Sequence, residues 1–285
     1  MHLTLIILIC SGLSPVDESK PAAAVVDTTA PSDATSASDS TDAQPLPQAH
    51  AHNDYYHTRP LLDAVECGFC SFEADIFLVN EQLLVGHFSF ELKPECSLQS
   101  LYLDPLRKLV TANGGRVYKG GPEVTLLIDI KNKGEQTWAR LREVLAEYDD
   151  ILSEVNNGKV TRRAVRVIIS GDRPQQAIAA TTRRFAGIDG RLSDLGSDKP
   201  PHLMPLISDR WSSHFQWFGE GEFPAEQREK LQRYVKQTHA AGRRIRFWAT
   251  PDRPSVWSEL QKAGVDHINA DDLNGLKNYL KSQPQ

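Results

Sequence analysis

A short segment of alternating apolar and acidic residues, Ser71 to Leu78, restricts the fold of this chain more than any other feature. Side chains of a β-strand point to opposite faces in turn, so a strand here turns Ser71, Glu73 and Asp75 to one face and apolar residues to the other. Burying unpaired carboxylates costs several kcal/mol each. Because a bound divalent cation offsets that cost, the segment predicts a strand that carries a charged functional site.

Other apolar runs also end in polar residues. His50 and His52 are two residues apart in a short alternating segment, and His87 follows the apolar run after Leu78. Asp129 and Lys131 are again two apart, at the end of a continuous apolar run. A histidine exchanges a proton near neutral pH, so these positions are candidates for acid–base chemistry beside the two acids.

The whole chain alternates strand-like and helix-like segments. We expect eight strands, at 49–54, 71–78, 124–131, 164–170, 184–189, 203–208, 244–249 and 265–270. Helical patterns occupy 61–66, 98–112, 135–148, 174–181, 224–241, 255–263 and 273–281, and none is visible in 190–202. This alternation predicts an α/β fold, and eight units predict one TIM (β/α)8 barrel. A doubly wound open sheet is the alternative, but no glycine-rich nucleotide fingerprint follows the first strand.

The N-terminal region differs in composition from the rest. We interpret residues 1–14 as a signal peptide, although it lacks Lys or Arg, and 15–48, rich in Ser, Thr, Ala, Asp and Pro, as a disordered linker. The barrel is then expected at 49–285, in a secreted or periplasmic protein. The net charge of −5 lies entirely in residues 1–48, so the barrel is neutral and lacks the basic surface typical of nucleic-acid binding.

Cysteine usage is weakly informative. Cys67, Cys70 and Cys96 are expected to be ordinary thiols, and a disulfide between Cys67 and Cys70 is the alternative for an exported chain. The lone C-x2-C has no second ligand pair for a structural zinc site.

The acidic residues favour a hard cation. Glu73, Asp75 and Asp129 supply the oxygen ligands that Mg²⁺ or Ca²⁺ prefers, whereas zinc held by His50, His52 and His87 is the less favoured alternative. A cation that holds a phosphate oxygen, a nearby Lys131 and two histidines acting as base and acid together form an arrangement that can cleave a phosphodiester.

Six motifs in order resemble those of a known superfamily. They are His50-Ala-His-Asn-Asp-Tyr55, Phe72-Glu-Ala-Asp75, Val85-Gly-His87, Leu127-Ile-Asp-Ile-Lys131, Phe247-Trp248 and Gly264-Val-Asp-His-Ile-Asn-Ala-Asp271. The chain therefore resembles the PLC-like phosphodiesterases, in the branch of glycerophosphodiester phosphodiesterase, sphingomyelinase D and phosphatidylinositol-specific phospholipase C. The resemblance implies a TIM barrel, a Mg²⁺ or Ca²⁺ ion held by an E-x-D pair and a third carboxylate, and two catalytic histidines.

The resemblance also implies roles for single residues. Glu73 and Asp75 match the E-x-D pair, with Asp129 as the third ligand, while His87 matches the second catalytic histidine. Lys131 matches the phosphate-facing lysine of the sphingomyelinase D-like members, and Trp248 the wall against the head group. Either His50 or His52 is the first histidine; we favour His52, which directly precedes the loop at Asn53.

The chain departs from the glycerophosphodiesterase pattern at two places. His52-Asn-Asp stands where that pattern has His-Arg-Gly, and the Glu-Asn-Thr metal loop has no counterpart, which questions a glycerol-type substrate. Asn53 and Arg59 are further candidates for contact with the substrate. The aromatic segment 208–218 is interpreted either as a lid over the substrate or as ordinary loop packing.

Our prediction is a phosphoric diester hydrolase that acts on a small-molecule or lipid phosphodiester, with transient contact to a membrane surface. A non-catalytic barrel that binds phosphate or a lipid head group is the alternative. A zinc hydrolase acting on carbon–nitrogen or ester bonds is a third interpretation, and it requires the histidine-rich centre.

Overall fold

The computed structural model describes residues 43–283. The predicted signal peptide and residues 15–42 of the predicted linker lie outside the described residues. The structure moves the start of the barrel, because strand β1 (Leu46–Ala51) begins before residue 49 and Leu46 is buried. Pro45, Pro47 and Gln48 interrupt the apolar pattern here, so the sequence alone does not mark this strand start.

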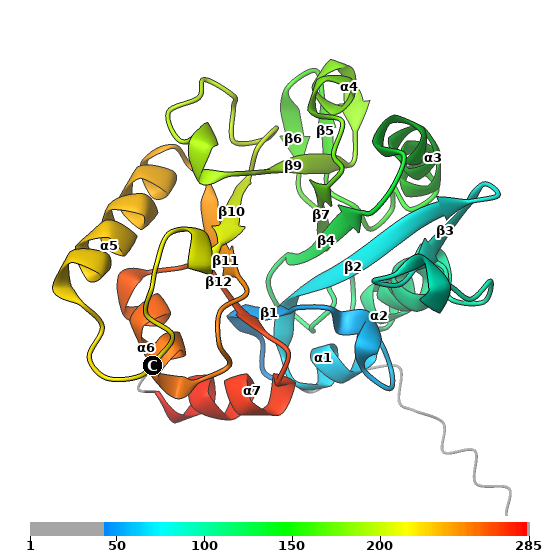
Figure 1. Cartoon of the computed structure of the whole chain (residues 1–285). Coiled ribbons are helices and arrows are strands. Elements are labelled where there is room, and N and C mark those ends of the chain that lie inside the picture. Colours follow the sequence, from blue (N-terminus) through cyan, green and yellow to red (C-terminus); the bar gives the residue numbers. More distant parts are fainter. Residues whose placement is uncertain (1–42, 284–285) are drawn as a thin grey trace, which may run out of the picture. The chain divides into compact units, whose positions relative to one another are not determined.

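Eight parallel strands close into a barrel, which confirms the predicted fold (Figure 1). They are β1, β2 (Phe69–Val79), β4 (Val124–Ile130), β7 (Val165–Gly171), β9 (Ala186–Gly190), β10 (Leu206–Arg210), β11 (Arg244–Trp248) and β12 (His267–Ala270). Neighbours around the ring follow the order β1-β12-β11-β10-β9-β7-β4-β2, and β2 pairs again with β1. All eight carboxyl ends therefore meet at one mouth.

Helices cover the outside of this ring (Figure 1). They are α1 (Leu62–Glu66), α2 (Asp104–Ala112), α3 (Gly134–Ala146), α4 (Gln175–Ala180), α5 (Ala225–Ala240), α6 (Pro254–Ala263) and α7 (Leu273–Ser282). Between β9 and β10 the chain forms only a 3-10 turn, Leu192–Asp194, as the pattern of 190–202 indicated. Within residues 43–283, no helix combines the length and apolarity that a membrane span requires.

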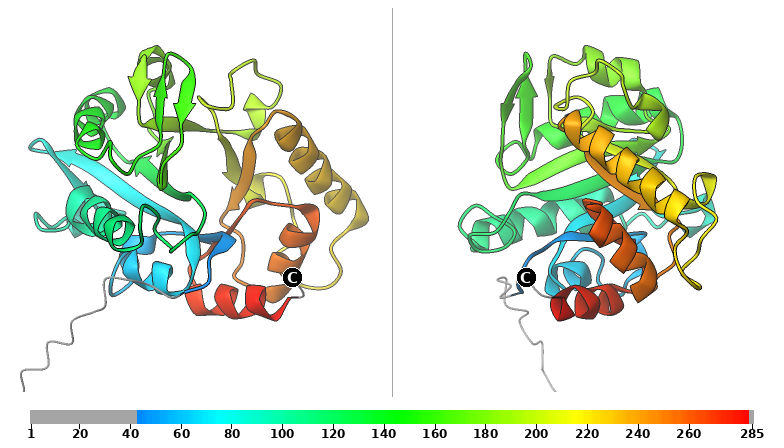
Figure 2. Two further views of the ribbon diagram at one scale, coloured as in Figure 1. Left: turned by 180° about the vertical axis from the view of Figure 1, so that it is seen from behind. Right: turned by 90° about the vertical axis from the view of Figure 1, so that its left-hand side faces the viewer.

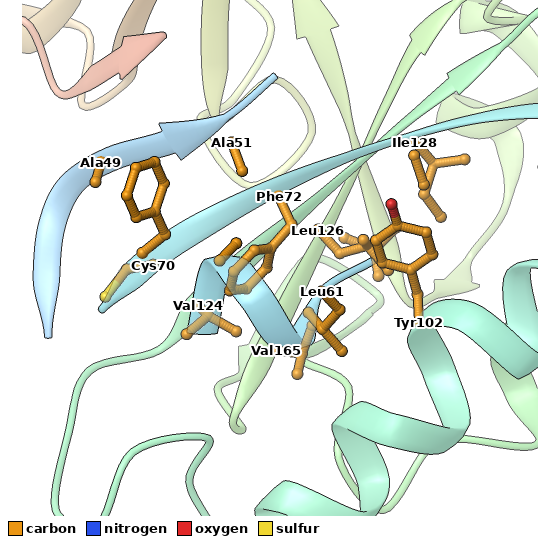
Figure 3. Packing of buried hydrophobic residues seen from close by; sticks show 14 of the residues in the cluster. Ala49, Ala51, Leu61, Cys70, Phe72, Tyr102, Val124, Leu126, Ile128 and Val165 are labelled. Atoms are coloured by element: carbon orange, nitrogen blue, oxygen red, sulfur yellow. The ribbon is translucent and has the colours of Figure 1, made fainter. Parts of the chain in front are cut away.

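The two faces of the barrel strands differ sharply. Outward side chains such as Phe72 and Leu126 pack with helical residues such as Tyr102 in one large apolar core (Figure 3). The apolar cluster inside the barrel is small and consists of Leu127, Ile168 and Leu206. The outer core supplies the burial that stabilises the fold, at about 1.5–3 kcal/mol for each large side chain, so the interior is left to polar groups.

A hairpin adds one antiparallel strand beside β2. Strand β3 (Gln82–Val85) pairs with the end of β2, and Asn80 and Glu81 form the turn, both with positive φ. This short turn folds the chain directly back, so that Ile76 lies opposite Val85. His87 is thereby brought back to the mouth of the barrel.

A small separate sheet was not predicted. It consists of β5 (Glu154–Asn156), β6 (Lys159–Thr161) and β8 (Arg183–Arg184), and its β5–β6 hairpin stands away from the ring of strands (Figure 2). These strands have two or three residues each and carry many charged side chains, so no alternating apolar pattern marks them.

Two further expectations can be compared with the structure. Cys67, Cys70 and Cys96 are free thiols, which excludes the alternative disulfide between Cys67 and Cys70.

In the aromatic segment 208–218, Trp211 and Phe215 are buried and stack with ring centroids 4.1 Å apart. The packing interpretation is therefore confirmed for these two rings, because they belong to the core, whereas Phe218 at the end of the segment is exposed.

Candidate active site

Three carboxylates converge at the mouth of the barrel. Asp75 on β2 lies opposite Asp129 on β4 in the parallel register, and Glu73 is two residues before Asp75 on the same face. One oxygen from each of the three lies within 4.8 Å of the others. In the part of the chain that the structure describes, this is the one group of three or more acidic, histidine or cysteine side chains with such spacing.

Asp75 is completely buried, and all its donors converge on one oxygen. Oδ2 accepts from Lys131 Nζ at 2.7 Å, lies 2.7 Å from the Tyr55 hydroxyl and 2.9 Å from His87 Nδ1. Oδ1 is equally buried and has no partner among the described residues. Burial and the charge of Glu73 raise the pKa of Asp75 above its ordinary value, against the opposing effect of Lys131.

Lys131 joins the two upper carboxylates. Its ammonium group lies 2.7 Å from Asp75 and 3.0 Å from Asp129 Oδ1. Burial lowers the pKa of Lys131, but the two carboxylates outweigh it and raise that pKa. Burial raises the pKa of Asp129 to about 6. We call Asp75, Asp129 and Lys131 the mouth cluster.

Glu73 lies deeper and has a different partner. Its Oε2 accepts from Arg246 Nη1 at 2.7 Å, and the same guanidinium group donates to His50 Nε2. His50 Nδ1 lies 2.6 Å from Ser71 Oγ, so Nδ1 carries the proton in the simplest assignment. Burial would raise the pKa of Glu73, but Arg246 holds it well below its usual range. We call His50, Glu73 and Arg246 the inner triad.

Burial and the charge of Arg246 lower the pKa of His50 to about 4. Its side chain is 1% exposed, and both ring nitrogens are engaged inside the barrel. His50 is therefore a neutral structural histidine in this arrangement, which separates it from His52. The alternative zinc site also loses a ligand, since His50 has no free nitrogen.

His52 and His87 have parallel surroundings. His52 Nδ1 lies 2.8 Å from Asp271 Oδ1, and His87 Nδ1 lies 2.9 Å from Asp75 Oδ2, while Nε2 of each ring has no hydrogen bond among the described residues. Burial alone would lower the pKa of His52, but Asp271 and Glu73 raise it. Each carboxylate fixes its ring, so both histidines can exchange a proton through Nε2.

Two residues of the loop after β1 connect these histidines. The Tyr55 hydroxyl lies 2.7 Å from Asn53 Oδ1 and 3.1 Å from His87 Nδ1, and Asn53 Nδ2 lies 3.2 Å from His52 Nδ1. Asn53 has a left-handed backbone with φ 46°, which Asn tolerates better than most residues. The loop thus holds the relative positions of the two histidines.

The two remaining predicted substrate contacts, Trp248 and Arg59, have different partners. Trp248 ends β11 beside Arg210, whose guanidinium carbon lies 5.5 Å from the Trp248 ring centroid. The prediction for Arg59 is not supported: its guanidinium group bonds Asp63 at 2.8 Å and Glu66 at 2.6 Å. These acids follow Arg59 by four and seven residues and already satisfy its charge.

Sequence reasoning missed two residues of the site. Arg246 was in a predicted strand without a role, although its position two residues before Trp248 places both on the same face. Tyr55 was part of the first motif but also received no role. The period of two could have identified Arg246; nothing in the sequence indicates that the Tyr55 hydroxyl reaches Asp75.

The donor set fits a hard divalent cation. The three carboxylates offer only oxygen ligands, and the buried Oδ1 of Asp75 lacks the partner that a buried acceptor normally has. Lys131 occupies Asp75 Oδ2 and Asp129 Oδ1, which leaves the second oxygen of each carboxylate outside its ion pairs. Mg²⁺ or Ca²⁺ therefore matches these residues better than zinc.

Two known protein families match parts of this chain. A family described as the AIM6-like phosphodiesterase domain matches residues 38–189, and the glycerophosphoryl diester phosphodiesterase family matches residues 244–274. The Altered inheritance of mitochondria protein 6 homolog of Arthroderma benhamiae is 30% identical over 270 residues, covering 83% of this chain and 84% of that protein. The Altered inheritance of mitochondria protein 6 of Eremothecium gossypii is 29% identical over 276 residues, covering 84% and 70%.

Solved structures share the fold at low sequence identity. A glycerophosphodiester phosphodiesterase from Parabacteroides distasonis superposes with a TM-score of 0.51 at 16% identity, covering 85% of this chain and all of that one. A calcium-dependent phosphoinositol-specific phospholipase C from Pseudomonas gives a TM-score of 0.51 at 11% identity, covering 79% and 88%. At these identities the likeness shows a common fold only.

Proposed function

The chain belongs to the AIM6-like phosphodiesterase family, and from this premise we propose that it is a metal-dependent phosphoric diester hydrolase. We propose a glycerophosphodiester or a phospholipid head group as its substrate. The observation that carries the proposal is the pair of oriented histidines, His52 with Asp271 and His87 with Asp75, beside the three carboxylates. A barrel that only bound phosphate would not need two rings with unengaged Nε2 atoms.

The two histidines divide the proton transfers. The raised pKa of His52 suits a general acid, which gives its Nε2 proton to the leaving alkoxide oxygen as the phosphorus–oxygen bond breaks. In the same displacement, His87 Nε2 takes the proton of the nucleophile, a water or a hydroxyl of the substrate itself, as the new phosphorus–oxygen bond forms. The paired carboxylates Asp271 and Asp75 keep each ring in the tautomer that this exchange requires.

The other residues of the site would hold the cation, the phosphate and the groups attached to the phosphate. Glu73, Asp75 and Asp129 would hold Mg²⁺ or Ca²⁺, which stabilises negative charge on a phosphate oxygen. Lys131 stays protonated between its two carboxylates and adds positive charge at the same position. Trp248 and Asn53 stand at the mouth, where they would contact the groups on either side of the phosphate.

The partner and compartment of the protein follow from the same proposal. We propose that a lipid phosphodiester would be reached by transient contact with a membrane surface, and that the chain is exported by its N-terminal apolar segment. Both parts rest on the sequence, since the segment lies outside the described residues.

The proposed function is tested by hydrolysis of glycerophosphodiesters, lysophospholipids and bis(p-nitrophenyl) phosphate by the full chain. We expect turnover with Mg²⁺ or Ca²⁺ and none with EDTA, because the carboxylates need a cation to hold the phosphate. Asp75→Asn should remove turnover without altering the fold, while Asp198→Asn, the same chemical change at an exposed position, is the matched control. A folded protein that binds the cation but hydrolyses none of these substrates would favour the phosphate-binding barrel.

A further inference from the structure

The end of the barrel opposite the mouth contains an unusual concentration of positive charge. Arg244 and His267 are the first residues of β11 and β12, and Arg166 is the second residue of β7. The alternation of each strand turns all three side chains into the barrel. Their neighbours along the chain, such as Ile245 and Ile268, belong to the outer core. Three basic side chains therefore meet at the floor of the barrel, behind the inner triad.

The arginines in and beside this region differ in whether a carboxylate pairs with them. Arg166 pairs with Glu123 at 2.6 Å, and Arg246 pairs with Glu73 at 2.7 Å. Arg244 forms no ion pair with any residue in 43–283, and its one side-chain hydrogen bond reaches Thr125 Oγ1 at 3.5 Å. One positive charge at the floor is therefore left without a carboxylate partner.

His267 is the second independent observation. Its side chain is 2% exposed, and neither ring nitrogen has a hydrogen-bond partner among the described residues. Burial and the charge of Arg244 lower the pKa of His267 well below its ordinary value, so the ring is neutral and keeps one N–H donor. A buried donor without an acceptor costs about 1–3 kcal/mol, which indicates that an acceptor belongs at this place.

A partly open cavity is lined by both Arg244 and His267. Its volume is about 250 Å³, several times the roughly 30 Å³ share of one water molecule in the liquid, so a five-atom anion fits together with water. Two acids also line it, but both are engaged. Glu123 pairs with Arg166, while Asp266 accepts from the Ile245 amide at 2.8 Å and lies 2.8 Å from His239.

We propose that this floor cavity binds a small oxyanion of the phosphate class, held by Arg244 and by the N–H of His267. The anion completes the ion pair that Arg244 lacks and accepts a hydrogen bond from the His267 N–H, which has no acceptor within residues 43–283. The floor cavity is distinct from the mouth cluster, because the inner triad and the apolar cluster of Leu127, Ile168 and Leu206 lie between them. The proposal does not depend on the proposed hydrolase activity.

Binding of inorganic phosphate to the full chain, in EDTA so that no cation recruits phosphate to the mouth, tests the proposal by isothermal titration calorimetry. We expect saturable binding in the wild type and at least a tenfold loss of affinity in Arg244→Met, which keeps the length of the side chain but removes its charge. The matched control Lys131→Met removes a cation at the mouth and should bind phosphate as the wild type does. Loss in Lys131→Met with none in Arg244→Met would place the anion at the mouth and overturn the proposal.

A second measurement needs no variant at the floor. The imidazole nitrogen resonances of His267 in the wild-type protein should shift saturably with phosphate, because its N–H gains an acceptor. The phosphate concentration at the midpoint of this shift should agree with the dissociation constant from calorimetry. Resonances that do not move while phosphate is added to millimolar concentration would overturn the proposal, even if Arg244→Met failed to fold.

Discussion

Glu73 in the inner triad and Asp75 in the mouth cluster are two residues apart on β2, yet the pKa values of their carboxyl groups shift in opposite directions. Glu73 and Asp75 each accept from a cationic side chain at 2.7 Å. The pKa of Glu73 is held well below its usual range, whereas that of Asp75 is raised. One close cation therefore does not decide the direction of the pKa shift. Burial and the charge of Glu73 outweigh Lys131 at Asp75, whereas Arg246 outweighs burial at Glu73.

Along β2, the two clusters also differ in how completely their polar groups are paired. The inner triad is closed, because Glu73, Arg246 and His50 satisfy one another and are almost fully buried. The mouth cluster is incomplete, because Asp75 Oδ1 has no hydrogen-bond partner within residues 43–283. A buried acceptor left in this way costs stability, and a bound cation offsets that cost. We infer that the inner triad stabilises the barrel, and that Glu73 also joins Asp75 and Asp129 in holding a cation.

The largest effects should come from separate substitutions of His50, on β1, and of His52, in the loop after it. His52→Gln should lower kcat/KM by about 10²–10⁴-fold with little change in stability, because it removes a proton donor at the mouth. His50→Gln should mainly lower stability, because it opens the inner triad. Kinetics and urea unfolding on both variants measure the two effects. A stable His50→Gln protein with the greater loss of activity would reverse our assignment.

Removal of the inner cation should cost more stability than removal of the outer one. Arg246→Met leaves Glu73 charged and unpaired inside the barrel, so we expect a loss of about 3–5 kcal/mol in the free energy of unfolding. Lys131→Met should cost less, because Asp75 already has a raised pKa and can take up a proton.

Urea denaturation followed by tryptophan fluorescence measures both losses. The double variant Arg246→Met with Glu73→Gln is the control, and it should recover part of the stability because no buried charge is left. Equal losses in Arg246→Met and Lys131→Met would show that depth in the barrel does not distinguish the two ion pairs.

Asp54 extends the comparison to a buried carboxyl group with no cation at all. It accepts from the Leu61 amide and forms no ion pair within residues 43–283, and burial raises its pKa to about 7. Between about pH 4 and 7 the folded state therefore holds a proton that the unfolded state has lost. Stability contributed by this group is complete below about pH 4 and is lost as the pH rises to about 7.

Asp54→Asn should flatten this part of the pH dependence, because its amide oxygen can still accept from Leu61. At about 1.4 kcal/mol per pKa unit, we expect the difference from the wild type to change by roughly 2–4 kcal/mol over this window. Thermal unfolding across the window measures it, with Asn at the exposed Asp198 as control. Parallel curves for wild type and Asp54→Asn would mean that Asp54 is charged in the fold.

Local patterns in the sequence predict the parts of the site that depend on local geometry. The alternation of Glu73 and Asp75 predicts a strand with both acids on one face, and Asp129 follows from the end of an apolar run. The eight alternating units predict the barrel, because parallel strands need helical connections. These features depend on residues close together in the chain.

The pairings that distinguish the two clusters depend on barrel closure. Arg246 and Glu73 are 173 residues apart, and His52 and Asp271 are 219 apart. No local pattern selects such partners, since they meet only through the order of strands around the ring. Arg59 is the opposite case, because its ion-pair partners Asp63 and Glu66 lie within two helical turns of it. Local spacing in the sequence could therefore have predicted these pairs.

The smallest effect should come from one hydroxyl of the mouth. Tyr55→Phe removes a donor 2.7 Å from Asp75 Oδ2, so Asp75 keeps only Lys131 and His87, and the His87 ring loses a neighbour 3.1 Å away. A hydrogen bond to a charged group contributes about 1.5–3 kcal/mol, so we expect kcat/KM to fall by about tenfold or somewhat more.

Tyr56→Phe is the matched control, because the Tyr56 hydroxyl bonds Glu91 on the exposed side of the same loop. It should leave kcat/KM unchanged. Steady-state kinetics at several pH values separates the two roles of Tyr55, since loss of a bond to Asp75 also shifts the pH profile. If Tyr55→Phe behaved like Tyr56→Phe, the hydroxyl would only fill space and would not contribute to the difference between the two clusters.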